Sequence, residues 1–175
     1  MRFGDDFDGF ALYEAMNTRR VERALSWKQV ADELWEQSAE LNRRRSDHPI
    51  SPATLTGIAK RGDTTCQHAL FILRWLGRDA ESFMSVAASN GNTALPSVGP
   101  DRRLRWNLAA LYDALDARRR ERELTWRALA RELRCTDHQL TGIKTARYAI
   151  GMTLAMRIVQ WLERPAADFI YAAKW

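Results

Sequence analysis

Apolar residues recur at helical spacing at the start of the C-terminal part of the chain. Leu104, Leu108, Leu111 and Leu115 follow one another at intervals of three or four residues, which places them on one face of an α-helix. A charged stretch over residues 118–123 follows them. The pattern predicts a first helix that begins near residue 104 and ends in that charged stretch.

Capping residues and further apolar spacing predict four more helices in this part. They are a second helix after Thr125 with Ala128, Leu129 and Leu133 inward, a third of about nine residues after Thr136 with Leu140 and Ile143 inward, a fourth over residues 152–162, and a short fifth over residues 165–170. The gap between the second and third helices is only three or four residues, so the two must cross steeply.

The whole pattern occurs twice in the chain. Residues 12–34 align without a gap onto residues 111–133, with 12 identities in 23 positions. The match resumes downstream, where residues 55–58 and residues 140–143 share the sequence Leu-Thr-Gly-Ile. A duplication in fixed order predicts two copies of one small helical unit.

The repeat sets the domain boundaries. We expect a first domain over residues 10–84, a linker over residues 85–100 that is rich in Ser, Asn, Gly and Pro, and a second domain over residues 101–175. The first copy carries an insertion over residues 35–50. Val30, Leu34, Ser38 and Leu41 keep helical spacing into it, which predicts that the second helix overruns by two or more turns and returns by a loop near residues 47–49.

The charge of the chain is unevenly shared between the copies. Residues 1–100 hold 12 basic and 13 acidic residues, a net −1, whereas residues 101–175 hold 15 basic and 9 acidic residues, a net +6. Because Lys and Arg give phosphate affinity, a polyanion would be held mainly by the second copy.

Several classes of protein find little support in the composition. Cys66 and Cys135 occupy non-equivalent places with no CxxC pattern, which favours thiols in a reducing compartment over a disulfide or a metal site. The longest apolar runs fall short of 18 residues and the N-terminus is acidic, so we expect a soluble cytoplasmic protein. With three histidines in unrelated contexts and no phosphate-binding glycine loop, we expect neither an enzyme, nor a cofactor, nor a metal.

The second copy places apolar and small residues at a characteristic set of positions, namely Leu124, Thr125, Leu129, Ala130, Leu133, Leu140 and Ile143. This run resembles the helix-turn-helix of the lambda-repressor-like (Cro/repressor, Xre) family, and the likeness extends over most of residues 104–170 and over residues 10–34 and 51–84. The resemblance implies an all-α fold of two tandem lambda-repressor-like helix-turn-helix domains of about five short helices each, the first with its insertion between helices two and three.

The resemblance also implies which residues meet DNA, because the third helix of such a domain lies in the major groove. Its exposed face supplies base contacts in the second copy from Thr136, Asp137, His138, Gln139 and Thr141, and in the first copy from Ser51, Thr54 and Thr56. Flanking basic residues would hold phosphates: Arg127, Lys144, Arg147, Lys28, Arg43, Arg44, Arg45, Lys60 and Arg61.

One position departs from the family pattern in the same way in both copies. Trp27 and Trp126 stand where relatives often carry a phosphate-contacting glutamine. Matched aromatic residues on a surface usually mark a contact, so we expect them to join the two domains as a pseudo-dimer. The alternative is that each tryptophan packs inside its own domain while the linker leaves the domains independent.

These observations favour a sequence-specific DNA-binding transcriptional regulator in which the second domain is the main reader. The alternative is a protein-interaction module, an adaptor or an antitoxin-like partner, which keeps the helix-turn-helix as a fold. The small-residue face and acidic balance of the first copy favour this alternative for that half. A homodimer is a further possibility, although one chain can act as a pseudo-dimer.

Overall fold

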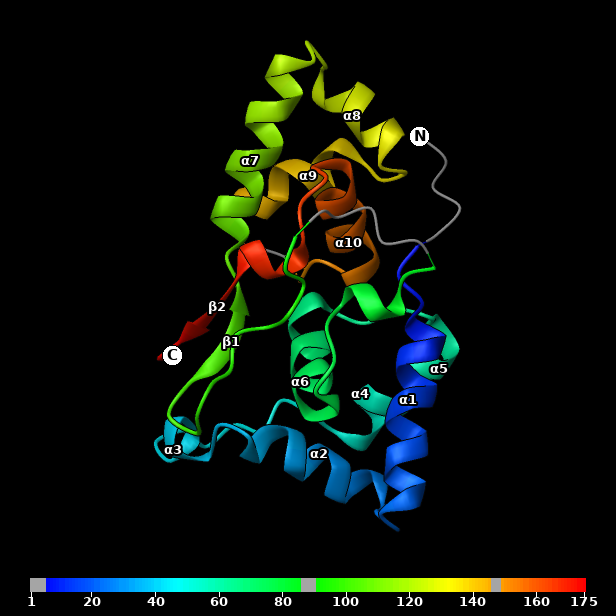
Figure 1. The fold of residues 1–175 in the computed structure, drawn as a ribbon, viewed down its shortest axis with the longest axis vertical. Coiled ribbons are helices and arrows are strands. Elements are labelled where there is room, and N and C mark those ends of the chain that lie inside the picture. Colours follow the sequence, from blue (N-terminus) through cyan, green and yellow to red (C-terminus); the bar gives the residue numbers. More distant parts are fainter. Residues whose placement is uncertain (1–5, 86–90, 146–148) are drawn as a thin grey trace.

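The structure is a computed structural model, and it describes residues 6–85, 91–145 and 149–175. The chain is mostly helical, as expected, but it also contains one small antiparallel sheet of two strands (Figure 1). We refer to residues 10–84 as the N-terminal half and to residues 101–175 as the C-terminal half. In Figure 1 the helices of the N-terminal half occupy the lower part of the view and those of the C-terminal half the upper part.

The N-terminal half is made of short helices. In chain order they are α1 (Gly9–Glu22), α2 (Trp27–Glu36), α3 (Ala39–Asn42), α4 (Pro52–Thr56), α5 (Ile58–Arg61), α6 (Cys66–Leu76) and the 3-10 helix η1 (Glu81–Phe83). Side chains cap several of these helices: Asp8 caps α1, Ser26 caps α2, Ser51 caps α4 and Thr65 caps α6.

The C-terminal half repeats the main helices of this order and adds the sheet. Its elements are β1 (Arg103–Trp106), α7 (Leu108–Glu121), α8 (Trp126–Glu132), α9 (Asp137–Gly142), the 3-10 helix η2 (Ile143–Thr145), α10 (Met152–Trp161), the 3-10 helix η3 (Ala166–Phe169) and β2 (Ile170–Ala173). The expected helices after Thr125, after Thr136 and over residues 152–162 are therefore present with boundaries close to those expected.

The two ends of the C-terminal half differ from the expectation. Leu104 lies in β1 and not in a helix, and α7 begins at Leu108 because the Asn107 side chain caps it by accepting a hydrogen bond from the amide of Ala110. The expected fifth helix is shortened to η3, and residues 170–173 pair with residues 103–106. This pairing gives hydrogen-bond partners to the backbone groups of both segments. The local sequence pattern of neither segment indicates the pairing.

The insertion also differs from the expected extension of one helix. The second helix of the N-terminal half, α2, ends at Glu36 and not two or more turns later, and α3 is a separate short helix. The side chain of Asn42 at the end of α3 donates to the carbonyl of Trp35 at 2.8 Å, which turns the chain back on itself. The return through residues 47–49 is a loop, as expected.

The two halves meet where α6 and α10 begin. The amide of Cys66 donates to the carbonyl of Ile150, and the amide of Met152 donates to the carbonyl of Thr64, both at 2.8 Å. Cys66 and Met152 are each the first residue of their helix. Each half therefore donates one bond from the start of its helix to the residue before the bridge in the other half. The contact is thus a local pseudo-two-fold, centred on an antiparallel bridge between Thr65 and Gly151.

One hydrogen bond at this bridge breaks the pseudo-two-fold symmetry. The side chain of Asp63 reaches across it and accepts a hydrogen bond from the amide of Thr153 at 3.1 Å, so one half supplies a cap for a helix of the other. Gly151 has no side chain with which to cap α10. A Cβ at Gly151 would lie 2.7 Å from the Asp63 carboxylate, which explains why glycine stands there.

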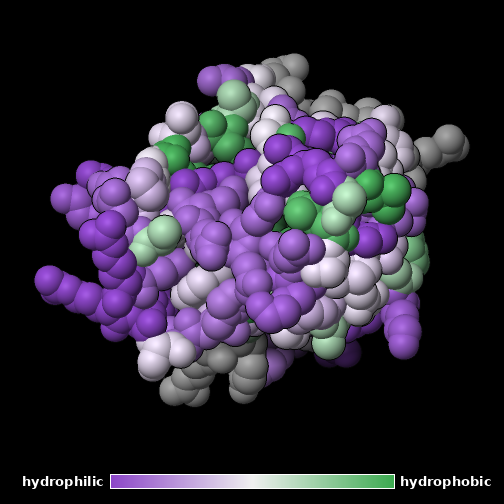
Figure 2. Space-filling model, turned by 90° about the horizontal axis from the view of Figure 1, so that it is seen from below, coloured by the Kyte–Doolittle hydropathy of each residue, from purple (hydrophilic) through white to green (hydrophobic). Residues whose placement is uncertain are grey.

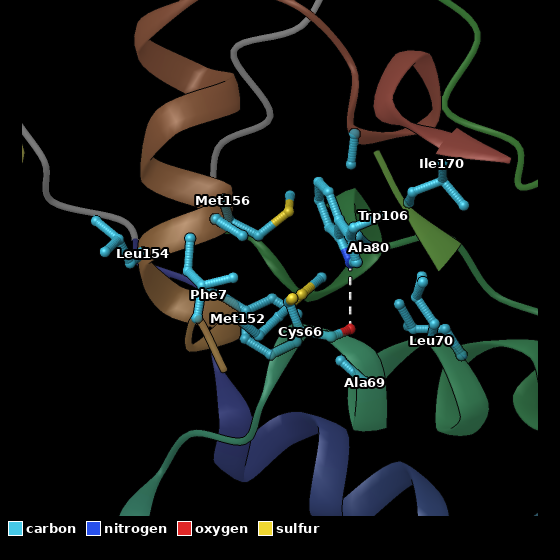
Figure 3. Close-up of a cluster of buried hydrophobic side chains, with 14 of the residues drawn as sticks. Phe7, Cys66, Ala69, Leu70, Ala80, Trp106, Met152, Leu154, Met156 and Ile170 are labelled. Atoms are coloured by element: carbon cyan, nitrogen blue, oxygen red, sulfur yellow. Dashed lines mark hydrogen bonds between the residues drawn. The ribbon is translucent and has the colours of Figure 1, made fainter. Parts of the chain in front are cut away.

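One hydrophobic core runs through both halves. Figure 3 shows the junction, where Phe7 from the N-terminal segment lies near Met152, Leu154 and Met156 of α10. The indole of Trp106 donates to the carbonyl of Cys66 at 3.1 Å across the junction. The two halves therefore share a packed interior.

The sheet and the insertion provide a second junction. Arg103 of β1 is 4% exposed and lies over the rings of Trp35 and Phe71, with its guanidinium 4.7 Å and 5.4 Å from the two ring centroids. It donates to the side chain of Asn42 at 2.5 Å. The insertion of the N-terminal half thus holds a strand of the C-terminal half.

The described part of the linker is docked on the N-terminal half. Arg74 of α6 donates to the carbonyls of Val98 and Gly99, and the carbonyl of Pro100 accepts from the amides of Glu40 and Leu41. These bonds hold residues 98–100 against α3 and α6. Together with the two junctions, they oppose the alternative of halves that move independently on a free linker.

Within the residues described, no helix is long and apolar enough to cross a membrane.

Candidate nucleic-acid interface

The expected reading helix of the C-terminal half is α9, which packs across α8. Thr136 caps α9 and forms a capping box with Gln139, while Ala130, buried at 3% exposure, leaves room for the two helices to approach. Leu140 points inward and is fully buried. The structure leaves the expected base-contacting side chains of this helix exposed: Thr136, Asp137, His138, Gln139 and Thr141.

The hydrogen bonds on this face restrict what each side chain can offer. The Oε1 atom of Gln139 accepts from the amide of Thr136 at 2.9 Å, so the Nε2 amino group is the part that can face a base. The hydroxyl of Thr141 donates to the carbonyl of Asp137 at 3.1 Å. A bidentate contact of Gln139 with adenine would require the capping box to open.

Exposed basic residues flank α9. Arg127 and Arg131 lie one turn apart on α8, and neither makes an ion pair within the described ranges. Lys144 follows α9, with its amino group 5.6 Å from the ring centroid of Tyr112. Arg147, expected as a further phosphate contact, falls outside the described residues. Arg131 was missed in the sequence, although its spacing of four from Arg127 marks a shared face.

A groove of about 400 Å³ runs beside α9 towards the bridge between the halves. Its lining residues include His138 and Gln139 of α9, together with Asp63, Arg134 and Arg157. Arg157 holds both oxygens of Asp6 at 2.7 Å, and Arg134 contacts the same carboxylate at 2.9 Å. The hydrogen bond from Arg157 holds the pKa of Asp6 below its usual range.

The expected reading helix of the N-terminal half, α4, presents a different surface. Its polar side chains bond locally: Ser51 and Thr54 form a capping box, and the hydroxyl of Thr56 donates to the carbonyl of Pro52 at 3.1 Å. Ser51 is exposed, while Thr54 and Thr56 are half-buried. Pockets beside α4 and α9 share Asp63 and Gly151 as lining residues, so the two helices border one surface across the bridge.

The basic residues expected at phosphates in the N-terminal half divide into two groups. Lys28 is paired with Asp32 at 2.7 Å, and Arg45 is paired with Asp47 at 2.8 Å. The others are exposed: Arg43, Arg44, Lys60 and Arg61. Seen from below, where α2 and α3 lie, the surface is mostly hydrophilic with small separate hydrophobic patches (Figure 2).

The structure corrects the expected role of Trp27 and Trp126. Each indole stacks on a tyrosine of its own half, Trp27 on Tyr13 and Trp126 on Tyr112, with ring centroids 5.5 Å and 5.3 Å apart. Figure 1 places α2 and α8, which carry them, at opposite ends of the molecule.

Arginines complete the two stacks. Arg20 lies over Trp27 and Arg119 over Trp126, so each indole is enclosed by α1 or α7 of its own half. Different aromatic residues, Trp35 and Trp106, take part in the junctions between the halves.

The thiols show no feature of a reactive site. Burial raises the pKa of Cys66 to about 12 and that of Cys135 to about 11, which keeps both protonated near neutral pH. Among the described residues, no group of three or more His, Cys, Asp or Glu side chains is placed to hold a metal ion.

Comparison of the chain with known protein families, with curated proteins and with solved structures gives no match.

Proposed function

We propose that the chain is a sequence-specific double-stranded DNA-binding transcriptional regulator with two tandem lambda-repressor-like helix-turn-helix domains. It acts in the cytoplasm by binding and not by catalysis, and its C-terminal half is the main reader. The observation that carries the proposal is the surface of α8 and α9, where exposed polar side chains adjoin exposed basic ones. His138 and Asp137 would meet base edges, while Arg127, Arg131 and Lys144 would meet phosphates.

The electrostatics of α8 and α2 support the assignment of the main reader. Arg127 and Arg131 of α8 correspond, in the repeat, to Lys28 and Asp32 of α2. The second pair neutralises itself through an ion pair, whereas the first presents two positive charges one turn apart. A phosphate backbone would therefore be attracted to the C-terminal half.

The test uses the full chain, because the halves share one core. Duplexes selected from a random pool at stated salt should converge on an asymmetric site for the unaltered protein. His138→Ala should relax the preference at one or two base pairs by about 1–3 kcal/mol each and leave binding to random duplex unchanged. Arg127→Ala should weaken all sequences alike and lower the salt slope by about one unit.

The repeat supplies matched controls. Thr141→Ala and Thr56→Ala each remove a hydroxyl that donates to the carbonyl four residues earlier, so their effects on folding should be alike. A loss of sequence preference in the first variant alone supports reading by α9. If the unaltered chain enriches no sequence, or if His138→Ala weakens specific and random duplexes equally, the proposal is wrong.

One observation favours a protein-binding role for the N-terminal half. The hydroxyls of α4 bond within their own helix, and its exposed residues are small, so this helix offers few donors to a base edge. An adaptor-like or antitoxin-like function for that half would appear as DNA binding that survives changes in α4. A screen with Ala53→Asp tests this, since an added carboxylate should abolish any approach of α4 to phosphates.

A further inference from the structure

A second cavity lies at the junction of the halves, between the sheet and the segment that follows α9. Its volume is about 530 Å³, within the range of small-molecule sites. Lining residues come from both halves, from β1, β2 and the start of α6, and from Lys144 and Thr145 of η2. The cavity shares Ile143, Ala149 and Ile150 with the groove beside α9, but the cations and aromatic residues that line the cavity do not line that groove.

Aromatic rings form part of its wall. Trp106 contributes a buried indole, whereas Tyr171 and Trp175 are 37% and 64% exposed, among the most exposed large apolar side chains described. Open aromatic faces of this kind bind planar ligands, because stacking buries one face of the side chain and one face of the ligand. Stacking depends little on which planar ring the ligand carries.

Two cations face the same space. Arg105 and Lys144 line the cavity, and neither is paired with an Asp or Glu side chain in the part of the chain that the structure covers. The Nε group of Arg105 donates to the backbone oxygen of Trp175 at 2.8 Å, and the centroid of the Trp175 ring lies 4.2 Å from the guanidinium carbon. This anchoring leaves the terminal guanidinium nitrogens as donors for an anion.

We propose that this cavity binds a nucleotide, with the base stacked on Tyr171 and Trp175 and the phosphate held by Arg105 and Lys144. The rings accommodate a planar aromatic group, and the cations accommodate a negatively charged group attached to it. The same chemistry is available from a free mononucleotide and from an unpaired nucleotide of a single strand. The proposal does not depend on whether α9 reads duplex DNA.

The experiment is a titration of the full-length, isotope-labelled protein with adenosine monophosphate, followed by NMR and calorimetry. Amide and indole signals of residues 105, 144, 171 and 175 should shift together. Adenosine, which has the base without the phosphate, should bind at least about tenfold more weakly because it cannot engage the two cations. Absence of these shifts at millimolar nucleotide, or equal binding of adenosine, would overturn the proposal.

Variants separate stacking from charge. Tyr171→Ala and Arg105→Gln should each weaken binding by about tenfold or more, whereas Tyr171→Phe should stay within about twofold because it keeps the ring. Arg78→Gln is the matched control, since Arg78 also lies over a ring, that of Phe83 at 4.1 Å, outside the cavity. If Arg105→Gln folds and binds as tightly as the unaltered chain, the site is wrongly assigned.

A last arm identifies the source of the ligand. Tighter binding of a single-stranded oligonucleotide than of the mononucleotide would assign the cavity to an unpaired strand, and the reverse would assign it to a free nucleotide. No duplex is present in these titrations. Their failure would therefore leave the reading of duplex by α9 untouched, and failure of duplex selection would leave the nucleotide site untouched.

Discussion

Replacing the buried Arg103 should show whether its charge or its bulk holds the halves together. The side chain is 4% exposed, its Nε atom has no hydrogen-bond partner in the described part of the chain, and burial lowers the pKa of its guanidinium to about 10. We predict that Arg103→Met changes the free energy of unfolding by no more than about 1 kcal/mol, whereas Arg103→Ala lowers it by about 2–4 kcal/mol.

The magnitudes follow from opposing contributions. Methionine loses the contacts of the cation with Trp35 and Phe71, about 1–2 kcal/mol, and leaves the Oδ1 atom of Asn42 unpaired at a further 1–2 kcal/mol or so. Removing a buried charge with an unpaired donor stabilises the folded state by a similar amount, which offsets these losses. Alanine adds a cavity to the same losses, worth about 2–3 kcal/mol for the missing side-chain atoms.

The assay is denaturant unfolding of the full chain, followed by circular dichroism and by tryptophan fluorescence. The two probes should give one midpoint for each variant, which justifies a two-state free energy. The difference between the alanine and methionine variants is the sharpest quantity, because contributions common to both cancel. If Arg103→Met destabilises as much as Arg103→Ala, the charge and not the packing secures this junction, and the reasoning fails.

Three further predictions concern the contacts between the halves. Gly151→Ala should cost about 1–3 kcal/mol in urea unfolding because its Cβ meets the Asp63 carboxylate, and most of that cost should disappear in a chain that also carries Asp63→Ala; purely additive effects would contradict the close approach. Asp6→Asn should lower the free energy of unfolding at neutral pH, and this difference from the unaltered protein should vanish as the pH falls below about 3.8. The reason is that a carboxyl with a lowered pKa stabilises the fold only while it is ionised. A difference that persists in acid would exclude the ion pair as its cause. Glu81→Gln should raise the stability of the protein at neutral pH, and this gain in stability should shrink towards pH 4.5. Burial raises the pKa of Glu81, so on acidification the folded state takes up the proton before the unfolded state does. Melting curves that show a constant gain across this range would refute the explanation.

The helices around the candidate interface were predictable because their signals are local. Thr125 and Thr136 cap α8 and α9 as expected, and the apolar spacing of Leu129 and Leu140 faces them inward. The exposure of His138 and Gln139 follows from the same periodicity. Binary pattern and capping chemistry are short-range, so one sequence suffices to read them.

The features that lie between the halves required the structure. Leu104 is four residues before Leu108, which fits a helix, and two before Trp106, which fits a strand. Pairing with residues 170–173 decides between these readings, and its register is a long-range property. The contact of Asp6 with Arg157 joins residues 151 apart and leaves no periodic signal in the chain.

The position of Phe7 has a consequence for how the protein is made. It packs on Phe83 of the N-terminal half and also against α10, so part of its packing surface is translated only after the whole N-terminal half. At ribosomal rates of about 5–20 residues per second, the 75 residues of the C-terminal half take roughly 4–15 s to synthesise. Throughout that interval the N-terminal half holds an apolar face towards the solvent, and a nascent chain paused there is a natural substrate for chaperones. Codon changes that slow this stretch should therefore raise aggregation without altering the sequence.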